Sequence, residues 1–253
     1  MSQDTKELKL AVLIDADNVP YSNVKGMMEE IAKFGTPTTK RIYADWTKPN
    51  ANGWKGVLLE HAITPIQQYS YTVGKNSSDS ALIIDAMDLL YSGKLDGFCI
   101  VSSDSDFTRL AIRLRESGMK VIGIGEKKTP NPFIVACDRF IFIEVIEGAK
   151  KKKVVSTNAS ADDKKKDEKA LSKIDVDTID IIESSIEDIA EDDGWAFLGD
   201  VGNLIVKKKP EFDPRNYGFS KLTPLMKSLT HLLEIHERES DKKGIKHVYV
   251  RLK

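Results

Sequence analysis

The sequence predicts an α/β protein with two domains, a parallel sheet covered by helices and then a smaller unit of helices and a terminal hairpin. Short β-branched runs alternate with amphipathic segments of helical length up to about residue 146. This alternation is typical of a parallel sheet with helices between its strands. A lysine-rich stretch without aromatic side chains covers residues 148–173, and new apolar patterns begin after it.

Six apolar runs in the first part of the chain are the predicted strands: Leu10–Ile14, Lys40–Ala44, Thr64–Gln68, Phe98–Val101, Val121–Ile124 and Phe140–Ile143. Helices are expected between them. The clearest is "SDSALIIDAMDLLYSG", where Leu82, Ala86 and Leu89 belong to one apolar stripe that should pack on the sheet. Asp85 and Asp88 lie off this stripe, so we expect them to be solvated or to assist packing.

We therefore expect a first domain over residues 1–147, a flexible charged linker over 148–173 and a second domain over 174–253. The linker sequence cannot bury enough apolar surface to offset the entropy lost on ordering. The second domain contains three helical patterns, and its last segment alternates across a Lys243-Gly244 turn, which indicates a hairpin. Three helices and a β-ribbon are a winged-helix (α+β) pattern.

Composition narrows the possible functions. The chain has 253 residues and a formal net charge of −1, so nucleic-acid binding would have to come from local patches. Its two cysteines argue against a disulfide scaffold or a cysteine-rich zinc site and fit a reducing compartment. The N-terminus has no apolar signal region and no stretch reaches membrane-spanning length. We expect a cytoplasmic protein without a membrane partner.

Carboxylates gather where the predicted strands end. Asp15 closes the first strand in "KLAVLIDADNVP", and Asp104 and Asp106 follow the fourth in "CIVSSDSDF". Ligands of open α/β sheets bind outside the carboxyl ends of strands where the strand order reverses. If the first and fourth strands are neighbours there, Asp15 faces Asp104, and Asp79 joins them from the start of the crossover helix. Such a cluster is the ligand set of Mg²⁺ or Mn²⁺ and favours metal-dependent phosphodiester hydrolysis.

Structural roles compete with this interpretation. Asp106 could cap the helix that begins at Phe107, and Asp17 could form an Asx-turn before Pro20. Asp15 and Asp104 are harder to explain as caps, because they follow buried apolar strands and would meet at one edge.

Three segments in order, "LIDADN", "KNSSDSALIIDAMDLL" and "VSSDSDFTRLAIRLRESGMKVIGIG", resemble the NYN family of PIN-like ribonucleases. The resemblance covers residues 9–146 and implies a PIN-like sheet sandwiched by helices, a Mg²⁺ or Mn²⁺ site and endonucleolytic cleavage of RNA. It places the metal-binding and catalytic acids at Asp15, Asp79 and Asp104, supported by Asp106 and Asp17. The residues expected to contact substrate in this domain are Asn18, Asp17, Ser103, Lys75 and Arg109.

The second domain is similar to the LOTUS or OST-HTH module over about residues 175–253, through "FLGDVGNLI" and "FDPRNYGFSKLTPLM". That family implies RNA binding in some members and protein docking in others. The lysines at 207–209, with Lys242, Lys243, Lys246 and Arg251, are candidate phosphate contacts, and each taken singly also fits a solvated surface. The aromatic side chains expected to be core or loop anchors are Phe197, Phe212, Tyr217 and Phe219.

Two other functions compete with the ribonuclease. One is a non-catalytic RNA-binding or adaptor protein with a degenerate acidic pocket. The other is a haloacid dehalogenase-like phosphatase, because "DADNV" fits the opening of that family's motif, in which the first Asp is a nucleophile and Lys75 could serve as the lysine. The Asn at the fourth position and the winged-helix unit favour the nuclease.

Overall fold

The computed structural model describes residues 7–47, 53–69, 77–146, 174–239 and 246–253. The chain divides into two compact units, Met1–Val154 and Val155–Lys253. The predicted linker over residues 148–173, the Lys243-Gly244 turn and the candidate residue Lys75 lie outside the described residues. None of the helices in the described ranges combines the length and apolarity needed to cross a bilayer.

The N-terminal unit is a six-stranded sheet in the order β3-β2-β1-β4-β5-β6, and every strand pair is parallel. Its strands are β1 (Lys9–Asp15), β2 (Thr36–Ala44), β3 (Thr64–Gln67), β4 (Gly97–Val101), β5 (Lys120–Gly125) and β6 (Arg139–Phe142). Its α-helices include α1 (Val24–Ile31), α2 (Trp54–His61), α3 (Ser77–Tyr91), α4 (Thr108–Glu116) and α5 (Asn131–Ala136). The predicted parallel α/β fold and its six strands are confirmed.

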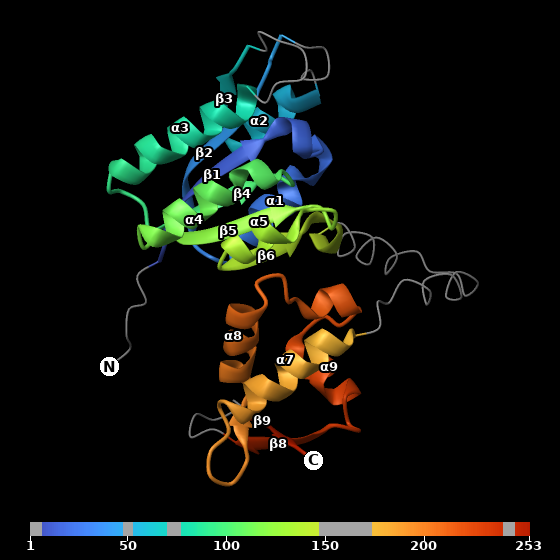
Figure 1. The fold of residues 1–253 in the computed structure, drawn as a ribbon. Coiled ribbons are helices and arrows are strands. Elements are labelled where there is room, and N and C mark those ends of the chain that lie inside the picture. Colours follow the sequence, from blue (N-terminus) through green and yellow to red (C-terminus); the bar gives the residue numbers. More distant parts are fainter. Residues whose placement is uncertain (1–6, 48–52, 70–76, 147–173, 240–245) are drawn as a thin grey trace, which may run out of the picture. The chain divides into compact units, whose positions relative to one another are not determined.

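The central strands β1, β4 and β5 are apolar on both faces because helices cover both (Figure 1). Along β1, Leu10, Val12 and Ile14 pack with α1 and α2, whereas Ala11 and Leu13 belong to the core on the other face, which includes residues of α3, α4 and α5. Since side chains alternate between faces, Asp15 at the end of β1 continues the α3 side of the sheet. The polar site is therefore built on that side.

Strand β2 begins at Thr36, four residues before the predicted start at Lys40, and it contains Pro37. Proline cannot donate a ladder hydrogen bond, so it is normally confined to unpaired strand positions. Here β3 pairs with β2 only from Arg41 onward, so Pro37 has a neighbour on the β1 side alone. The strand can therefore extend through the proline.

The C-terminal unit contains the three predicted helices, α7 (Val176–Glu187), α8 (Leu198–Lys208) and α9 (Leu222–Ser228). Strands β8 (Leu233–Glu239) and β9 (Lys246–Leu252) form the predicted antiparallel pair. A short strand that the sequence did not predict, β7 (Ala196–Phe197), adds to β9 and makes a sheet in the order β7-β9-β8. The expected small α+β domain is confirmed.

Candidate metal centre and its surroundings

The carboxylates lie where the strand order of the sheet reverses. The chain leaves β3 at one edge, crosses through α3, and enters β4 on the far side of β1. Strands β1 and β4 are parallel neighbours, with Ile14 opposite Val101. The condition on which the predicted convergence depended, adjacency of these two strands, is met.

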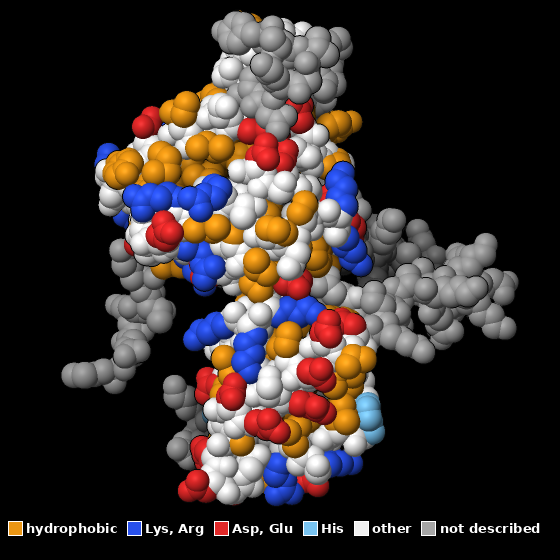
Figure 2. Space-filling view, viewed as in Figure 1, with side chains coloured by type: hydrophobic (Ala, Val, Ile, Leu, Met, Phe, Trp, Pro, Cys, Tyr) orange, Lys and Arg blue, Asp and Glu red, His pale blue; other side chains and the backbone are white. Residues whose placement is uncertain are grey.

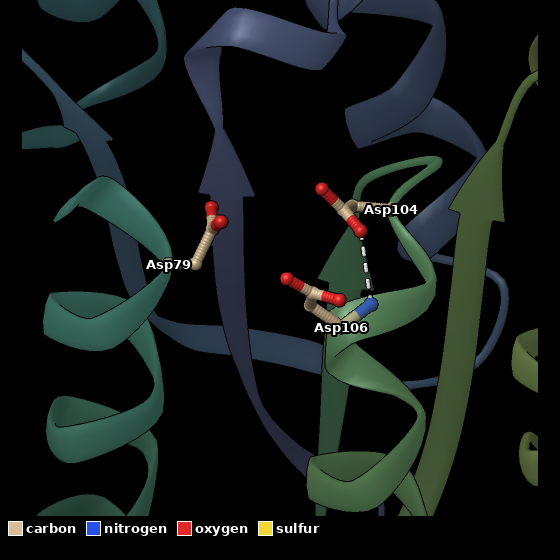
Figure 3. A group of neighbouring side chains, drawn as sticks. All are labelled: Asp79, Asp104 and Asp106. Atoms are coloured by element: carbon tan, nitrogen blue, oxygen red, sulfur yellow. Dashed lines mark hydrogen bonds between the residues drawn. The ribbon is translucent and has the colours of Figure 1, made fainter. Parts of the chain in front are cut away.

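Three aspartates form a cluster at this edge. One carboxylate oxygen from each of Asp79, Asp104 and Asp106 lies within 4.8 Å of the others. Figure 3 shows Asp79 reaching from the first turn of α3 toward Asp104 and Asp106, which follow β4. Asp79 is buried, Asp104 is half-buried and Asp106 is exposed. This graded exposure leaves one side of the cluster open to solvent.

Asp15 lies beside this cluster but is not one of the three described residues whose oxygens converge. It is 1% exposed, and its carboxylate accepts hydrogen bonds from Asn18 Nδ2 (2.5 Å), Ser102 Oγ (2.9 Å) and the Asp17 backbone (3.2 Å). Burial raises the pKa of Asp15, and the bonds from Asn18 and Ser102 oppose that rise. Asp15 is therefore a buried, hydrogen-bonded carboxylate. The cluster contains Asp106 in the place that the sequence predicted for Asp15.

Ser102 connects Asp15 to the cluster. Its hydroxyl donates to Asp15 Oδ2 and accepts from the Asp104 backbone N–H at 3.1 Å. Asp104 Oδ1 in turn accepts from the Asp106 backbone N–H at 2.9 Å (Figure 3). The sequence analysis named Ser103 and missed Ser102, although strand alternation could have found it, because Ser102 follows Phe98 and Ile100 on the α3 face of β4.

The two aspartates judged hardest to explain as caps do cap short turns. Asp15 and Asp104 occupy the N-cap positions of the 3₁₀ turns Ala16–Asn18 and Ser105–Phe107, and each accepts the backbone N–H two residues on. The N-cap position of α4 is occupied by Phe107, which has no side-chain cap bond. These caps fix the backbone that presents Asp104 and Asp106.

The predicted substrate contacts have distinct environments. Asn18 is half-buried and bound to Asp15, whereas Asp17 is exposed beside it. Ser103 Oγ accepts a hydrogen bond from the Glu126 backbone at 2.8 Å. Arg109 is exposed in the first turn of α4, directly after the turn that carries Asp106.

An ion pair that the sequence analysis missed holds α3 on the sheet. Asp85 pairs with Arg41 of β2 and accepts from the Tyr43 hydroxyl at 2.5 Å. Burial, and then the bond to Asp85, raise the pKa of Tyr43. The expected packing role of Asp85 is thereby explained, and the same helix begins with Asp79, so this contact helps to set where Asp79 meets its partners.

Most of the predicted basic contacts in the C-terminal unit already have partners. Lys208 Nζ donates to Asp188 at 2.7 Å, Lys209 Nζ donates to Thr178 Oγ1 at 2.6 Å, and Lys246 lies 3.7 Å from Glu237. Lys207 is exposed, and Lys243 lies outside the described residues. Acidic and basic side chains are interspersed over the visible face of this unit (Figure 2), so no single-sign field is seen there.

The aromatic residues of this unit divide between two environments. Phe212 and Tyr217 are in the core, and Phe219 packs against it, as expected. Phe197 differs, because it is half-buried outside that core and its ring contacts His247 and Tyr249. Phe197 therefore does not lie in the core, which is one of the two places expected for it.

The fold and the acidic edge define a nuclease-type α/β domain joined to a winged-helix unit. The family model of the NYN domain matches residues 9–144, just over half of the chain, so the chain belongs to the NYN family. The model of the OST-HTH/LOTUS domain, a module of RNA-binding type, matches residues 169–245. Both resemblances noted in the sequence are confirmed. Comparison with curated proteins gives no match.

Three solved structures are similar to parts of the chain. A protein of unknown function from Vibrio parahaemolyticus is 20% identical, covers 55% of this chain and 94% of its own, and has a TM-score of 0.47. An uncharacterized protein from Nitrosomonas europaea is 30% identical over 38% of this chain and 89% of its own, with a TM-score of 0.31. A protein from Chromobacterium violaceum is 36% identical over 32% of this chain and 86% of its own, with a TM-score of 0.25.

Proposed function

We propose that the protein is a metal-dependent endoribonuclease whose N-terminal unit hydrolyses RNA phosphodiester bonds and whose C-terminal unit binds RNA. The observation that carries the proposal is the convergence of Asp79, Asp104 and Asp106 at the switch point of the sheet. Membership of the NYN family, a nuclease-type fold, supports the same reaction class.

The donor set fits a hard divalent cation. The cluster offers carboxylate oxygens without a histidine or cysteine, and such oxygens are the ligands of Mg²⁺ and Mn²⁺. Asp79, Asp104 and Asp106 would hold the ion, and its positive charge would relieve the repulsion among them. When bound, such an ion supplies polarisation of a phosphodiester and activation of water.

The remaining residues orient the site and the substrate. Asp15 does so through Ser102, which fixes the backbone of Asp104. Asn18, bound to Asp15, and exposed Arg109 are placed to contact substrate, the latter by pairing with a phosphate. Asp17, Ser103, Lys75, Lys243 and Lys246 remain proposed contacts from the sequence.

The burial of Asp15 disfavours the phosphatase alternative. A nucleophilic carboxylate needs an oxygen open to the attacked phosphorus, but Asp15 is 1% exposed and its Oδ2 accepts two hydrogen bonds. Capture of a phospho-aspartate at Asp15 would establish the phosphatase and remove the nuclease.

The test is cleavage of a panel of single-stranded RNA, structured RNA and DNA with Mg²⁺, Mn²⁺ or EDTA. We expect metal-dependent cleavage of RNA that Asp104→Asn reduces by more than the roughly 10- to 100-fold typical of losing a residue that only orients a metal ligand. The matched control is Asp88→Asn, an exposed aspartate farther along α3. Protection against thermal unfolding by Mn²⁺ should be lost in Asp104→Asn and kept in Asp88→Asn.

The adaptor alternative gives a different result in the same assays. RNA binding without cleavage under any metal condition, together with no thermal shift on adding Mn²⁺, would favour an adaptor and overturn the metal site.

A further inference from the structure

The two faces of the C-terminal sheet differ in chemistry. On the inner face, Ala196, Leu233 and Val250 are buried in the core of the unit. Because side chains alternate along a strand, the outer face carries the intervening register pairs, in which Tyr249 lies opposite both Phe197 and His236. An outer face of this kind is normally polar. Here it carries aromatic rings and cations.

The rings and guanidinium groups of this outer face form one continuous layer. The Arg238 guanidinium lies 4.3 Å from the centre of the Tyr249 ring and 5.8 Å from that of Trp195. Arg251 lies 4.8 Å from the Trp195 ring, and Phe197 lies 5.8 Å from Tyr249. We call these five residues the aromatic platform.

Histidines and a hollow flank the platform. The His236 ring lies 5.7 Å from Trp195, and the His247 ring lies 5.3 Å from Phe197. A shallow hollow of about 470 Å³ opens beside Trp195 and is also lined by His236, Glu234 and Lys253. The platform thus adjoins space of the size that binds small ring systems.

Packing alone does not account for this arrangement. Cross-strand aromatic pairs stabilise hairpins, and Phe197 with Tyr249 is such a pair. However, Trp195 and Tyr249 are half-buried rather than buried, and neither belongs to the hydrophobic core of the unit. Aromatic rings and arginine planes at a surface are the groups on which unpaired bases stack.

The ion pairs of the platform arginines favour base stacking over attraction of RNA by net positive charge. Arg251 pairs with Glu234 at 2.5 Å, and Arg238 lies 3.8 Å from Asp193. These carboxylates orient the guanidinium groups and reduce the net positive charge of the face. A ligand held mainly through its rings fits this face better than one held through phosphates alone.

We propose that the outer face of the β7-β9-β8 sheet binds single-stranded RNA, with bases stacked on the rings of Trp195, Phe197 and Tyr249. Arg238 and Arg251 extend the stack and contact the backbone. A duplex keeps its base faces covered, so the platform selects unpaired strands. The proposal rests on the proposed function, since it identifies the surface by which the C-terminal unit would hold RNA for cleavage.

The test uses the full chain in EDTA, so binding is measured without any cleavage and the two proposals can fail separately. Fluorescence anisotropy with a short oligouridine should show that Tyr249→Leu weakens binding between about 5- and 150-fold, the range for loss of one stacked base. Tyr249→Phe keeps the ring and should bind within about twofold of wild type. Lys221→Ala, an exposed lysine directly before α9 to which no RNA contact is assigned, is the control and should have a small effect.

Several results would overturn the platform. They are unchanged affinity in Tyr249→Leu, a loss in Lys221→Ala as large as that in Tyr249→Leu, equal affinity for a matched RNA duplex, and no binding of either RNA. The last result would favour protein docking as the role of this face. If Tyr249→Leu fails to fold, Arg238→Gln removes only the guanidinium above the ring, and unchanged affinity in that variant would contradict the proposal equally.

Discussion

Replacing Ser102 with alanine tests how the buried carboxylate supports the acidic cluster. The Ser102 side chain is fully buried, and its hydroxyl serves Asp15 and the Asp104 backbone at once. The substitution removes one donor to a buried carboxylate and the acceptor of one backbone N–H. Each group left unsatisfied costs about 1–3 kcal/mol. We expect Ser102→Ala to lower the free energy of unfolding of the N-terminal unit by about 2–6 kcal/mol.

The loss of unfolding free energy in Ser102→Ala, called the deficit below, should depend on pH in a direction set by the pKa of Asp15. Burial raises the pKa of Asp15, so the folded state holds this proton more tightly than the unfolded state. That contribution to stability is present at low pH and is lost as pH rises through the folded pKa. Removing the Ser102 donor raises the pKa of Asp15 further. The deficit should therefore be largest at neutral pH and shrink as pH falls below the folded pKa.

Hydrogen exchange of the β1 and β4 amides in EDTA measures this free energy for the N-terminal unit alone. Ser92→Ala is the control, because its hydroxyl is exposed and bonds to the local Leu89 carbonyl, and its effect should stay within about 0.5 kcal/mol. Cleavage by Ser102→Ala should fall roughly 10- to 100-fold, as for a residue that orients a metal ligand. Wild-type stability together with wild-type cleavage would refute the role of Ser102.

Three further substitutions test separate contacts. Asp15→Asn should lower cleavage roughly 10- to 100-fold, as for a residue that orients a metal ligand, while the melting temperature holds or rises because burial disfavours a carboxylate there; wild-type turnover would exclude Asp15 from positioning the site. Asp85→Asn breaks the ion pair with Arg41 and should lower the free energy of unfolding by about 1–3 kcal/mol, whereas Asp88→Asn should change it little. Thermal unfolding measures both variants. Asp175→Ala removes the N-cap of α7 and should cost the C-terminal unit about 1 kcal/mol in urea unfolding, with Asp180→Ala as control. Burial raises the pKa of Asp175, but the hydrogen bonds from Thr178 outweigh burial, so the pKa is lowered in the folded state. The stability that Asp175 contributes is therefore present above its unfolded pKa and is lost as pH falls through its folded pKa.

The sequence by itself determined the strands and the edge of the sheet at which chemistry could occur. Runs such as Leu10–Ile14 are apolar at every position, which requires burial on both faces and hence helices on both. Asp15 and Asp104 follow such runs, so their placement at the carboxyl edge needed only local pattern. The same holds for the hairpin, whose apolar alternation specifies which face of β9 enters the core.

Only the tertiary structure decided which side chains meet. Convergence of Asp79 with Asp104 and Asp106 depends on how α3 crosses the sheet, and the link from Asp15 to this cluster depends on the Ser102 bridge. Asp85 reads as a surface residue until β2 places Arg41 and Tyr43 against it. Trp195 precedes β7 and Arg238 lies in β8. They meet because β9 pairs with both strands and places Tyr249 between Phe197 and His236. These contacts join residues far apart in the chain, so helix crossing and strand register create them, and neither can be obtained from local periodicity.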